Sequence, residues 1–175
     1  MTKTNKILLI TSSPRKKSNS TFMGQHIAEG IKGTIEKINI CDFKINPCIG
    51  CDNCKKNLKC IFNDDSEKII KKVEKAKIVI VASPVYFTGV PAQLKVFIDR
   101  NQIQWYKNRK KDKKNKKGII VLTADLKKKK NFIAAESEIK SFFAVNRIKC
   151  VKIFRFSSEE IKNFKKRSEK WELII

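Results

Sequence analysis

The chain has little of several residue types on which common catalytic and membrane segments depend. It carries one histidine, His26, in 175 residues. A single histidine provides no Ser/His/Asp or Cys/His catalytic set, so we do not expect hydrolytic chemistry. No apolar run approaches the roughly 20 residues of a membrane span, and the first residues contain no apolar region of signal-peptide length. We therefore expect a cytoplasmic protein that does not enter a membrane.

Acidic residues are also scarce, with 17 Asp and Glu against 40 Lys and Arg, which gives a net charge of +23. Such an excess attracts polyanions, anionic cofactors or an acidic protein partner. Hydrophobic residues make up 41% of the chain, enough for a globular core at this length. We find neither an internal repeat nor a linker, so we expect one domain over residues 1–175.

Short apolar runs rich in Ile and Val alternate with segments of helical periodicity. The runs predict strands at residues 6–11, 34–40, 78–82, 118–123 and 148–156. The intervening periodic segments predict helices at 20–32, after a cap at 64–66, at 92–104, around 133–143 and at 159–173. Five such β–α units predict an α/β fold with a five-stranded parallel sheet and helices on both faces.

In a sheet of this kind, ligands bind beyond the carboxyl ends of the strands. The loops 12–21, 83–89 and 124–130 follow strands one, three and four, so they are expected to meet at this edge. A cysteine-rich segment follows strand two. We therefore expect the cysteines and the ligand to be neighbours.

Four of the six cysteines fall within thirteen residues: Cys48, Cys51, Cys54 and Cys60. Steps of three turn three thiolates toward one point and a longer arm brings the fourth, which favours a [4Fe–4S] cluster. Tetrahedral zinc is the nearest alternative, but it usually takes a second C-x2-C pair or histidines. A structural or redox-active thiol loop without metal is the third. We expect Cys41 and Cys150 to pack as small hydrophobic residues.

The loop after the first strand is rich in hydroxyl groups, contains Arg15 and runs directly into a helix. Hydroxyls, a guanidinium and free helix amides form a cradle for an anion. The loop lacks both GxxxxGK[ST] and GxGxxG, so a monophosphate is a better ligand than ATP or a dinucleotide. The alternative is a polar helix cap without a ligand. Tyr86 and Phe87 follow the third strand, and beside an anion cradle they indicate flavin mononucleotide (FMN).

Several motifs together resemble one known family. They are Ser13-Pro-Arg-Lys, the pair Asn19–Ser20, the four cysteines, Asp64-Asp65, Ser83-Pro-Val-Tyr and the segment 91–100. Over about residues 5–105 the chain is similar to the iron–sulfur flavoproteins, flavodoxin-like relatives of the NAD(P)H-dependent FMN reductases. The resemblance implies strand order 2-1-3-4-5, with a cysteine-rich loop at about residues 44–62.

The resemblance also implies one FMN and one [4Fe–4S] cluster per subunit. The residues that match the FMN phosphate loop are Ser13, Arg15, Ser18, Asn19 and Ser20. Those that match the segment along the flavin ring are Pro84, Val85, Tyr86 and Phe87, with Thr123 and Ala124 at the pyrimidine end. The four cysteines match the cluster ligands. The chain departs from the family at Ser12, where glycine is usual, and at residues 123–130, which are rich in lysine instead of glycine.

These motifs predict an electron-transfer iron–sulfur flavoprotein, an oxidoreductase or electron carrier without a catalytic side chain of its own. The resemblance also implies a homodimer or homotetramer. We expect the protein to exchange electrons with an acidic redox protein such as a ferredoxin, docked at lysines 127–130 rather than within 107–117. One alternative is an NAD(P)H-dependent FMN or quinone reductase without a cluster. Another is a zinc-containing nucleic-acid-binding module. Asp99 and Arg100 are expected to form a structural or subunit-contact ion pair.

Overall fold

The computed structural model describes residues 5–108, 116–125 and 128–167, and its centre is a five-stranded parallel sheet. The strand order is β2-β1-β3-β4-β5. All four neighbouring pairs are parallel. The strands are β1 (Lys6–Thr11), β2 (Thr34–Asn39), β3 (Ile78–Pro84), β4 (Lys116–Ala124) and β5 (Ile148–Ser157). The predicted flavodoxin-like topology is therefore confirmed.

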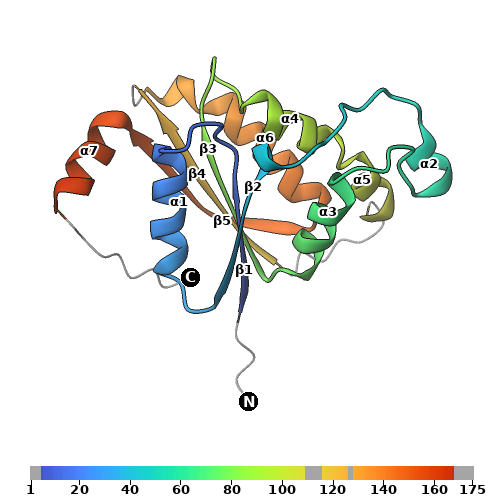
Figure 1. Ribbon diagram of the computed structural model, residues 1–175, viewed down its shortest axis with the longest axis horizontal. Coiled ribbons are helices and arrows are strands. Elements are labelled where there is room, and N and C mark those ends of the chain that lie inside the picture. The colour runs from blue at the N-terminus through green and yellow to red at the C-terminus, as the bar shows by residue number, and fades with distance from the viewer. Residues whose placement is uncertain (1–4, 109–115, 126–127, 168–175) are drawn as a thin grey trace.

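Helices cover both faces of this sheet (Figure 1). One face carries α1 (Asn19–Glu29) and α7 (Ser158–Arg167). The other carries α3 (Ser66–Lys75), α4 (Ala92–Asp99) and α6 (Ile133–Val145), with α5 (Gln102–Asn108) packed beside them. The short helix α2 (Asn53–Asn57) lies on a loop that projects away from the sheet (Figure 1). No helix among the described residues has the length and apolar character needed to cross a bilayer.

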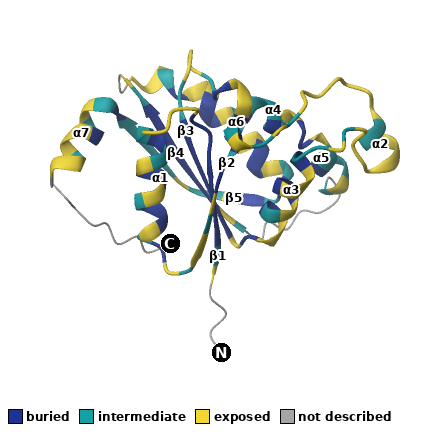
Figure 2. Cartoon of the chain, viewed as in Figure 1, coloured by how far each residue is buried: buried dark blue, intermediate teal, exposed yellow. Residues whose placement is uncertain are grey.

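The alternation of side chains along the strands explains the two layers. In β3, Val79 and Val81 pack with the helices α3, α4 and α6, whereas Ile78 and Ile80 face α1. A strand that is buried on both faces needs apolar residues at successive positions, which is why the run reads as continuously hydrophobic. Figure 2 shows this buried interior and the exposed surface of the loop that carries α2.

The helix predicted at residues 92–104 is in fact two helices. Helix α4 ends at Asp99, and α5 starts at Gln102. Between them the side chain of Asn101 donates a hydrogen bond to the carbonyl of Phe97 at 2.7 Å, and an asparagine that bonds its own backbone in this way competes with regular helix. Asn146 of the loop after α6 donates to the Asn101 side chain at 3.0 Å and fixes the break. The helix predicted at 159–173 is described as far as residue 167.

Candidate cofactor site and cysteine cavity

One cavity of about 290 Å³ opens at the carboxyl ends of the strands, close to the lower end of the range for ligand pockets, about 300–1,000 Å³. The structure brings nine of the eleven predicted FMN-contacting residues to it. They are Ser13, Arg15, Ser18, Asn19, Pro84, Val85, Tyr86, Thr123 and Ala124. The loops after β1, β3 and β4 therefore meet as the topology predicts. That these residues bind FMN remains a prediction.

The phosphate loop is held in shape by its own hydroxyl groups. Ser18 caps α1, because its side chain accepts a hydrogen bond from the backbone amide of Thr21 at 3.3 Å. The hydroxyls of Ser18 and Ser20 are 2.9 Å apart. Ser20 is buried and is not among the described residues that line the cavity, so it supports Ser18 from behind. The hydroxyl of Ser13 accepts a hydrogen bond from the backbone amide of Arg15 at 3.3 Å. The Arg15 side chain is exposed and lines the cavity.

Ser12, which stands where the similar family has glycine, is fully buried. Its hydroxyl finds no hydrogen-bond partner among the described residues. Its carbonyl accepts from the thiol of Cys41 at 3.6 Å, so Cys41 packs against the phosphate loop. A buried polar atom with no partner marks a place where a further polar group can be accommodated. Ser12 itself is not among the described residues that line the cavity. The hydroxyls of Ser13 and Ser18, which do line it, and the N-terminus of α1 fit the phosphate end of FMN.

The turn after β3 places Tyr86 in the cavity wall and Phe87 outside it. Tyr86 and Gly89 exchange two backbone hydrogen bonds of 3.0 Å. Phe87 and Thr88 between them adopt φ values of 48° and 68°, a left-handed conformation that is uncommon for such residues. Helix α6 fixes the turn, because Ala135 donates its backbone amide to the Thr88 carbonyl at 3.1 Å. As a result the Phe87 side chain is fully exposed and is not among the described residues of the cavity wall.

The sequence interpretation missed three residues that line this cavity, Lys17, Asp125 and Ser158. The Ser158 hydroxyl donates to the Asp125 carboxylate at 3.0 Å, so the start of α7 is tied to the loop after β4. Ser158 directly follows β5, and the carboxyl ends of parallel strands share one edge, so topology alone could have indicated it. Helix α7 also contributes Lys165, which donates to the Asn19 side chain at 3.0 Å.

A second, smaller cavity of about 50 Å³ is lined by all four cysteines of the motif. The six cysteines of the chain are all free thiols. Cys48, Cys51 and Cys60 are exposed and Cys54 is half-buried. Burial, together with the neighbouring thiols of Cys48 and Cys60, raises the pKa of Cys54. The other two cysteines, Cys41 and Cys150, lie outside this cavity.

The loop of residues 44–62, called the cysteine loop below, reverses direction several times. Gly50, Asp52 and Leu58 have φ values of 67°, 57° and 52°, and two of these three residues are not glycine. In the described residues, no three cysteine, histidine or acidic side chains converge into a site for a single metal ion. A cubane binds each thiolate through a different iron, so its ligands stand farther apart than those of a single ion. Four free thiols around one cavity therefore fit a cubane in donor type, and ligation remains a prediction.

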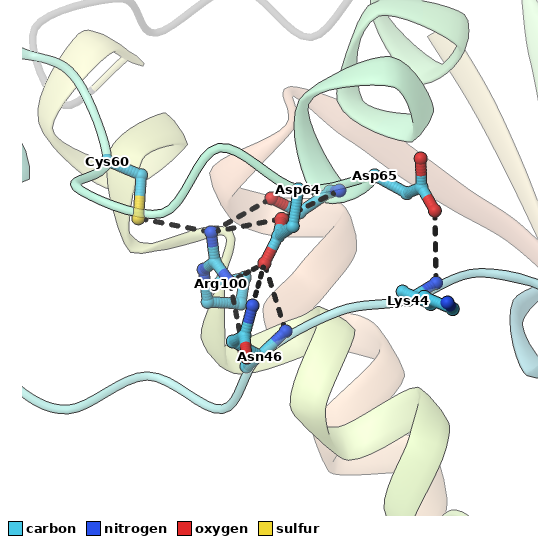
Figure 3. Close-up of polar contacts among 7 residues, drawn as sticks. Lys44, Asn46, Cys60, Asp64, Asp65 and Arg100 are labelled. Carbon is cyan, nitrogen blue, oxygen red and sulfur yellow. Dashed lines mark hydrogen bonds and ion pairs between the residues drawn. The ribbon is translucent and has the colours of Figure 1, made fainter.

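Two aspartates and one arginine hold the ends of the cysteine loop (Figure 3). Lys44 donates its backbone amide to Asp65 at 3.0 Å, and Asn46 donates its own to Asp64 at 2.9 Å. Asp64 is also paired with Arg100 at 2.6 Å. Burial would raise the pKa of Asp64, but the hydrogen bonds from Arg100 and from backbone amides outweigh it and hold that pKa well below its usual range.

Asp99 and Arg100 do not pair with each other. Asp99 pairs with Lys95 one turn earlier in α4, at 2.7 Å, and this pair is exposed. Arg100 turns instead toward Asp64, and this pair is buried. Adjacent side chains on a helix point in different directions, so Asp99 and Arg100 do not face each other and each pairs with a different residue.

The two cavities are separate, since no described residue lines both. After β2 the chain passes through a short 3-10 helix (Ile40–Asp42) that packs against α4. The cysteine loop then lies beside the far end of α4, at Asp99 and Arg100, and against α5. The expectation that cysteines and ligand are neighbours at the sheet edge is therefore not met within one chain, because the loop follows the helical layer away from that edge (Figure 1).

The sequence pattern of the family described as NADPH-dependent FMN reductase matches residues 5–158, which include every predicted site residue. The chain belongs to this family. The resemblance that the motifs indicated is thereby confirmed for the flavodoxin-like domain.

Individual relatives are named iron-sulfur flavoproteins. An iron-sulfur flavoprotein of Methanocaldococcus jannaschii is 42% identical over 102 residues, which are 55% of this chain and 52% of the relative. An iron-sulfur flavoprotein of Archaeoglobus fulgidus is 39% identical over 94 residues, 52% of this chain and 43% of the relative. The chain thus spans about half the length of the curated relatives that it matches.

The fold has solved counterparts. The crystal structure of an FMN-dependent NADH-azoreductase from Bacillus anthracis, in complex with FMN, has a TM-score of 0.67 and 16% sequence identity to this chain. The similarity covers 93% of this chain and 95% of the azoreductase. At this identity the likeness shows a shared fold.

Proposed function

We propose that this protein is an FMN-dependent oxidoreductase that also carries a [4Fe–4S] cluster and transfers single electrons between the two. The observation that carries the proposal is the presence of two distinct cavities in one chain. One has an anion cradle at the sheet edge, and the other is lined by four free thiols. The names of the relatives from M. jannaschii and A. fulgidus support the same combination.

The side chains of the first cavity bind and orient FMN. Arg15 and the hydroxyls of Ser13 and Ser18 hold the phosphate at the N-terminus of α1. The turn after β3 presents Val85 and Tyr86 to the ring, and its fixation by α6 keeps this wall in place. Thr123 and Ala124 close the cavity from β4. When bound, FMN supplies the one- and two-electron chemistry, and the protein supplies position and electrostatics.

The second cavity holds the cluster through Cys48, Cys51, Cys54 and Cys60. The apolar side chains of Ile61 and Ile103 line the same cavity and limit the access of water. We also propose that the protein works in the cytoplasm, because a reducing compartment keeps cysteines available as ligands.

We propose further that the protein acts as a homodimer or homotetramer. The two cavities are separate in one chain, so a second copy is the direct way to bring a cysteine cavity close to an FMN cavity. Large apolar side chains near the cysteine loop are available for such a contact: Ile49, Leu58, Ile61 and Trp105 are 62%, 45%, 51% and 51% exposed.

The electron donor or acceptor is proposed to be an acidic one-electron carrier of the ferredoxin type. The net charge of +23 favours an acidic partner. Exposed lysines occur on two loops: Lys55, Lys56 and Lys59 on the cysteine loop, and Lys128, Lys129 and Lys130 after β4. Residues 109–115 and 127 of the lysine runs named above lie outside the described residues.

The direct test is the composition of protein purified without oxygen. Wild type should contain about one FMN and about four iron and four sulfide per chain. Cys54→Ala should lose the iron and keep the FMN, whereas the matched variant Cys150→Ala, which changes a cysteine outside the cavity, should keep both. Zinc in place of iron in wild type, or iron that survives Cys54→Ala, would contradict the cluster assignment.

A second candidate is an NAD(P)H-dependent FMN or quinone reductase whose cysteine loop holds no cluster. It is favoured by the family match itself, which covers the FMN cavity. Oxidation of NAD(P)H by iron-free protein, at the same rate in wild type and Cys54→Ala, would support this candidate over the first.

A further inference from the structure

The Arg100 side chain donates hydrogen bonds to four residues at the cysteine loop and the start of α3, namely Asn46, Cys60, Asp64 and Ser66 (Figure 3). It is only 4% exposed, although arginine is seldom buried without partners. Nη1 donates to the Asn46 carbonyl at 2.7 Å and to Asp64 at 2.6 Å. Nη2 donates to the Cys60 sulfur at 3.1 Å and to the Ser66 hydroxyl at 3.1 Å. One guanidinium therefore joins both ends of the loop to the start of α3.

The geometry depends on the planar fork of arginine. The two terminal nitrogens point to different sides, so one can bind Asn46 while the other binds Cys60. A lysine offers one ammonium at a single point and cannot span the same set of acceptors. The break between α4 and α5 places Arg100 at the end of its helix, where the side chain reaches under the loop.

Cys60 is the cysteine that most needs such an anchor. Cys48, Cys51 and Cys54 are spaced by three residues, and α2 begins between them, so the local chain sets their positions. Cys60 follows α2 after Leu58, a left-handed residue, and is separated from Cys54 by five residues. A contact from outside the loop is what fixes its sulfur relative to the other three.

We propose that Arg100 is a positioning residue for the cluster: its N–H···S hydrogen bond orients Cys60 as the fourth ligand and raises the reduction potential. The inference rests on the proposed ligation of a [4Fe–4S] cluster by the four cysteines. Reduction adds one electron and hence one negative charge to the cluster and its thiolates. A donor aimed at a ligand sulfur stabilises the reduced form more than the oxidised form, and hydrogen bonds to sulfur are among the features that set cluster potentials.

The charge of Asp64 must be considered in any test of the effect of Arg100 on the reduction potential. The Asp64 carboxylate faces the same guanidinium, so the pair carries no net charge, and the N–H···S bond rather than a free positive charge carries the effect. Removal of Arg100 alone would leave Asp64 as an uncompensated charge near the cluster. The double variant Arg100→Gln with Asp64→Asn removes both charges together, and Arg100→Lys keeps the charge but loses the fork.

The experiment is a redox titration of anaerobic protein followed by electron paramagnetic resonance. Wild type, Arg100→Lys, the double variant and Lys95→Gln are compared. Lys95 lies on the same helix and forms an exposed pair with Asp99, so Lys95→Gln is the matched control for loss of a basic residue on α4. We expect about a tenfold lower equilibrium constant for one-electron reduction in both Arg100 variants, about 59 mV more negative, and no change in Lys95→Gln.

A second readout needs no cluster. Lys55, Lys56 and Lys59 are exposed on the cysteine loop, so trypsin reports how firmly the loop is held. Cleavage there should be several-fold faster in the Arg100 variants than in wild type or Lys95→Gln, with circular dichroism unchanged. Should the double variant fail to fold, Arg100→Lys decides the question alone.

The outcomes separate this inference from the proposed function. Wild-type protein without iron would overturn both. A cluster present in all variants, with the same potential in Arg100→Lys, the double variant and wild type, would overturn the role of Arg100 alone. Loss of the cluster from the folded Arg100 variants, with retention in Lys95→Gln, would support the positioning role.

Discussion

Gly24 of α1 lies so close to Ala82 of β3 that a Cβ added at Gly24 would stand 2.4 Å from the Ala82 methyl carbon. It would also stand 3.2 Å from the Leu9 side chain of β1. Contacts this short require either the helix or the strands to move. Glycine at this position thus sets the depth at which the first turns of α1 rest on the sheet, directly behind the phosphate loop.

Gly24→Ala should therefore destabilise the fold despite the higher helix propensity of alanine. Overpacking costs about 1–3 kcal/mol and the helix propensity of alanine returns about 1 kcal/mol, so we expect a net loss of up to about 2 kcal/mol. Urea unfolding followed by circular dichroism measures it. Gly89→Ala is the matched control, because its added Cβ would meet its nearest atom, a carboxylate oxygen of Glu138, at 3.7 Å, an ordinary contact. Equal stabilities of the two variants would contradict the close-packing argument.

Arg15→Ala should weaken FMN binding about ten- to a hundredfold, because it removes a charge-assisted hydrogen bond worth about 1.5–3 kcal/mol. Quenching of FMN fluorescence in a titration of the apoprotein gives the dissociation constant. Lys16→Ala is the control, since Lys16 has the same charge but is not among the described residues that line the cavity. Riboflavin, which lacks the phosphate, should bind poorly and equally to wild type and Arg15→Ala. A loss of riboflavin affinity that matches the loss for FMN would argue that Arg15 does not act on the phosphate.

The sequence predicted the central strands β1, β3 and β4 well because these strands are buried on both faces. The run 6–11 matches β1 at both ends, since a strand that is buried on both faces is apolar along almost its whole length and stands out in the sequence. The ends of the helices were harder to predict from the sequence. The break at Arg100 and Asn101 depends on a hydrogen bond from Asn146, which lies 45 residues away and has no local signature.

The candidate site was predictable where it follows from topology. The loops after β1, β3 and β4 had to meet, and they do. Phe87 could not be placed, because its exposure results from a tight turn whose two central residues are left-handed although neither is glycine. The place of the cysteine loop depended on its packing against α4 and α5, which motif spacing does not encode.

Glu36 of β2 provides a test of the pH dependence of stability. It pairs with Lys72 of α3 and, at 3.1 Å, with Lys6 of β1. The hydrogen bond from Lys72 lowers the pKa of Glu36, against the opposing effect of burial. A lowered folded-state pKa contributes stability that is present above about pH 4.5 and is lost as pH falls through the folded value.

Glu36→Gln should thus cost about 1 kcal/mol at pH 7 in urea unfolding, and the difference from wild type should shrink as the pH falls below about 4. Glu67→Gln, which breaks a single exposed pair with Lys71, should cost clearly less than Glu36→Gln, because water and salt screen exposed pairs. A difference between wild type and Glu36→Gln that grows toward acid pH would reverse the sign and contradict the assignment.

The docking of an acidic electron carrier can be located by two sets of three lysines. The sequence predicts docking at lysines 127–130, on the premise that FMN and cluster are neighbours. The two cavities are separate, so the premise fails within one chain. The proposed one-electron carrier would exchange with the proposed cluster, and the exposed lysines on the cysteine loop are Lys55, Lys56 and Lys59. We now expect these to guide the carrier.

Replacement of Lys55, Lys56 and Lys59 by glutamine should slow reduction by a ferredoxin about tenfold or more at low ionic strength and flatten its salt dependence, because steering acts on association and is screened by salt. The same change at Lys128, Lys129 and Lys130 removes an equal charge from the loop after β4 and should have little effect. Stopped-flow rates at several salt concentrations measure both. If only the second set slows the reaction, the carrier docks at the FMN edge. If the two sets slow it equally, the net charge of the whole protein guides the carrier and neither cavity has a dedicated docking surface.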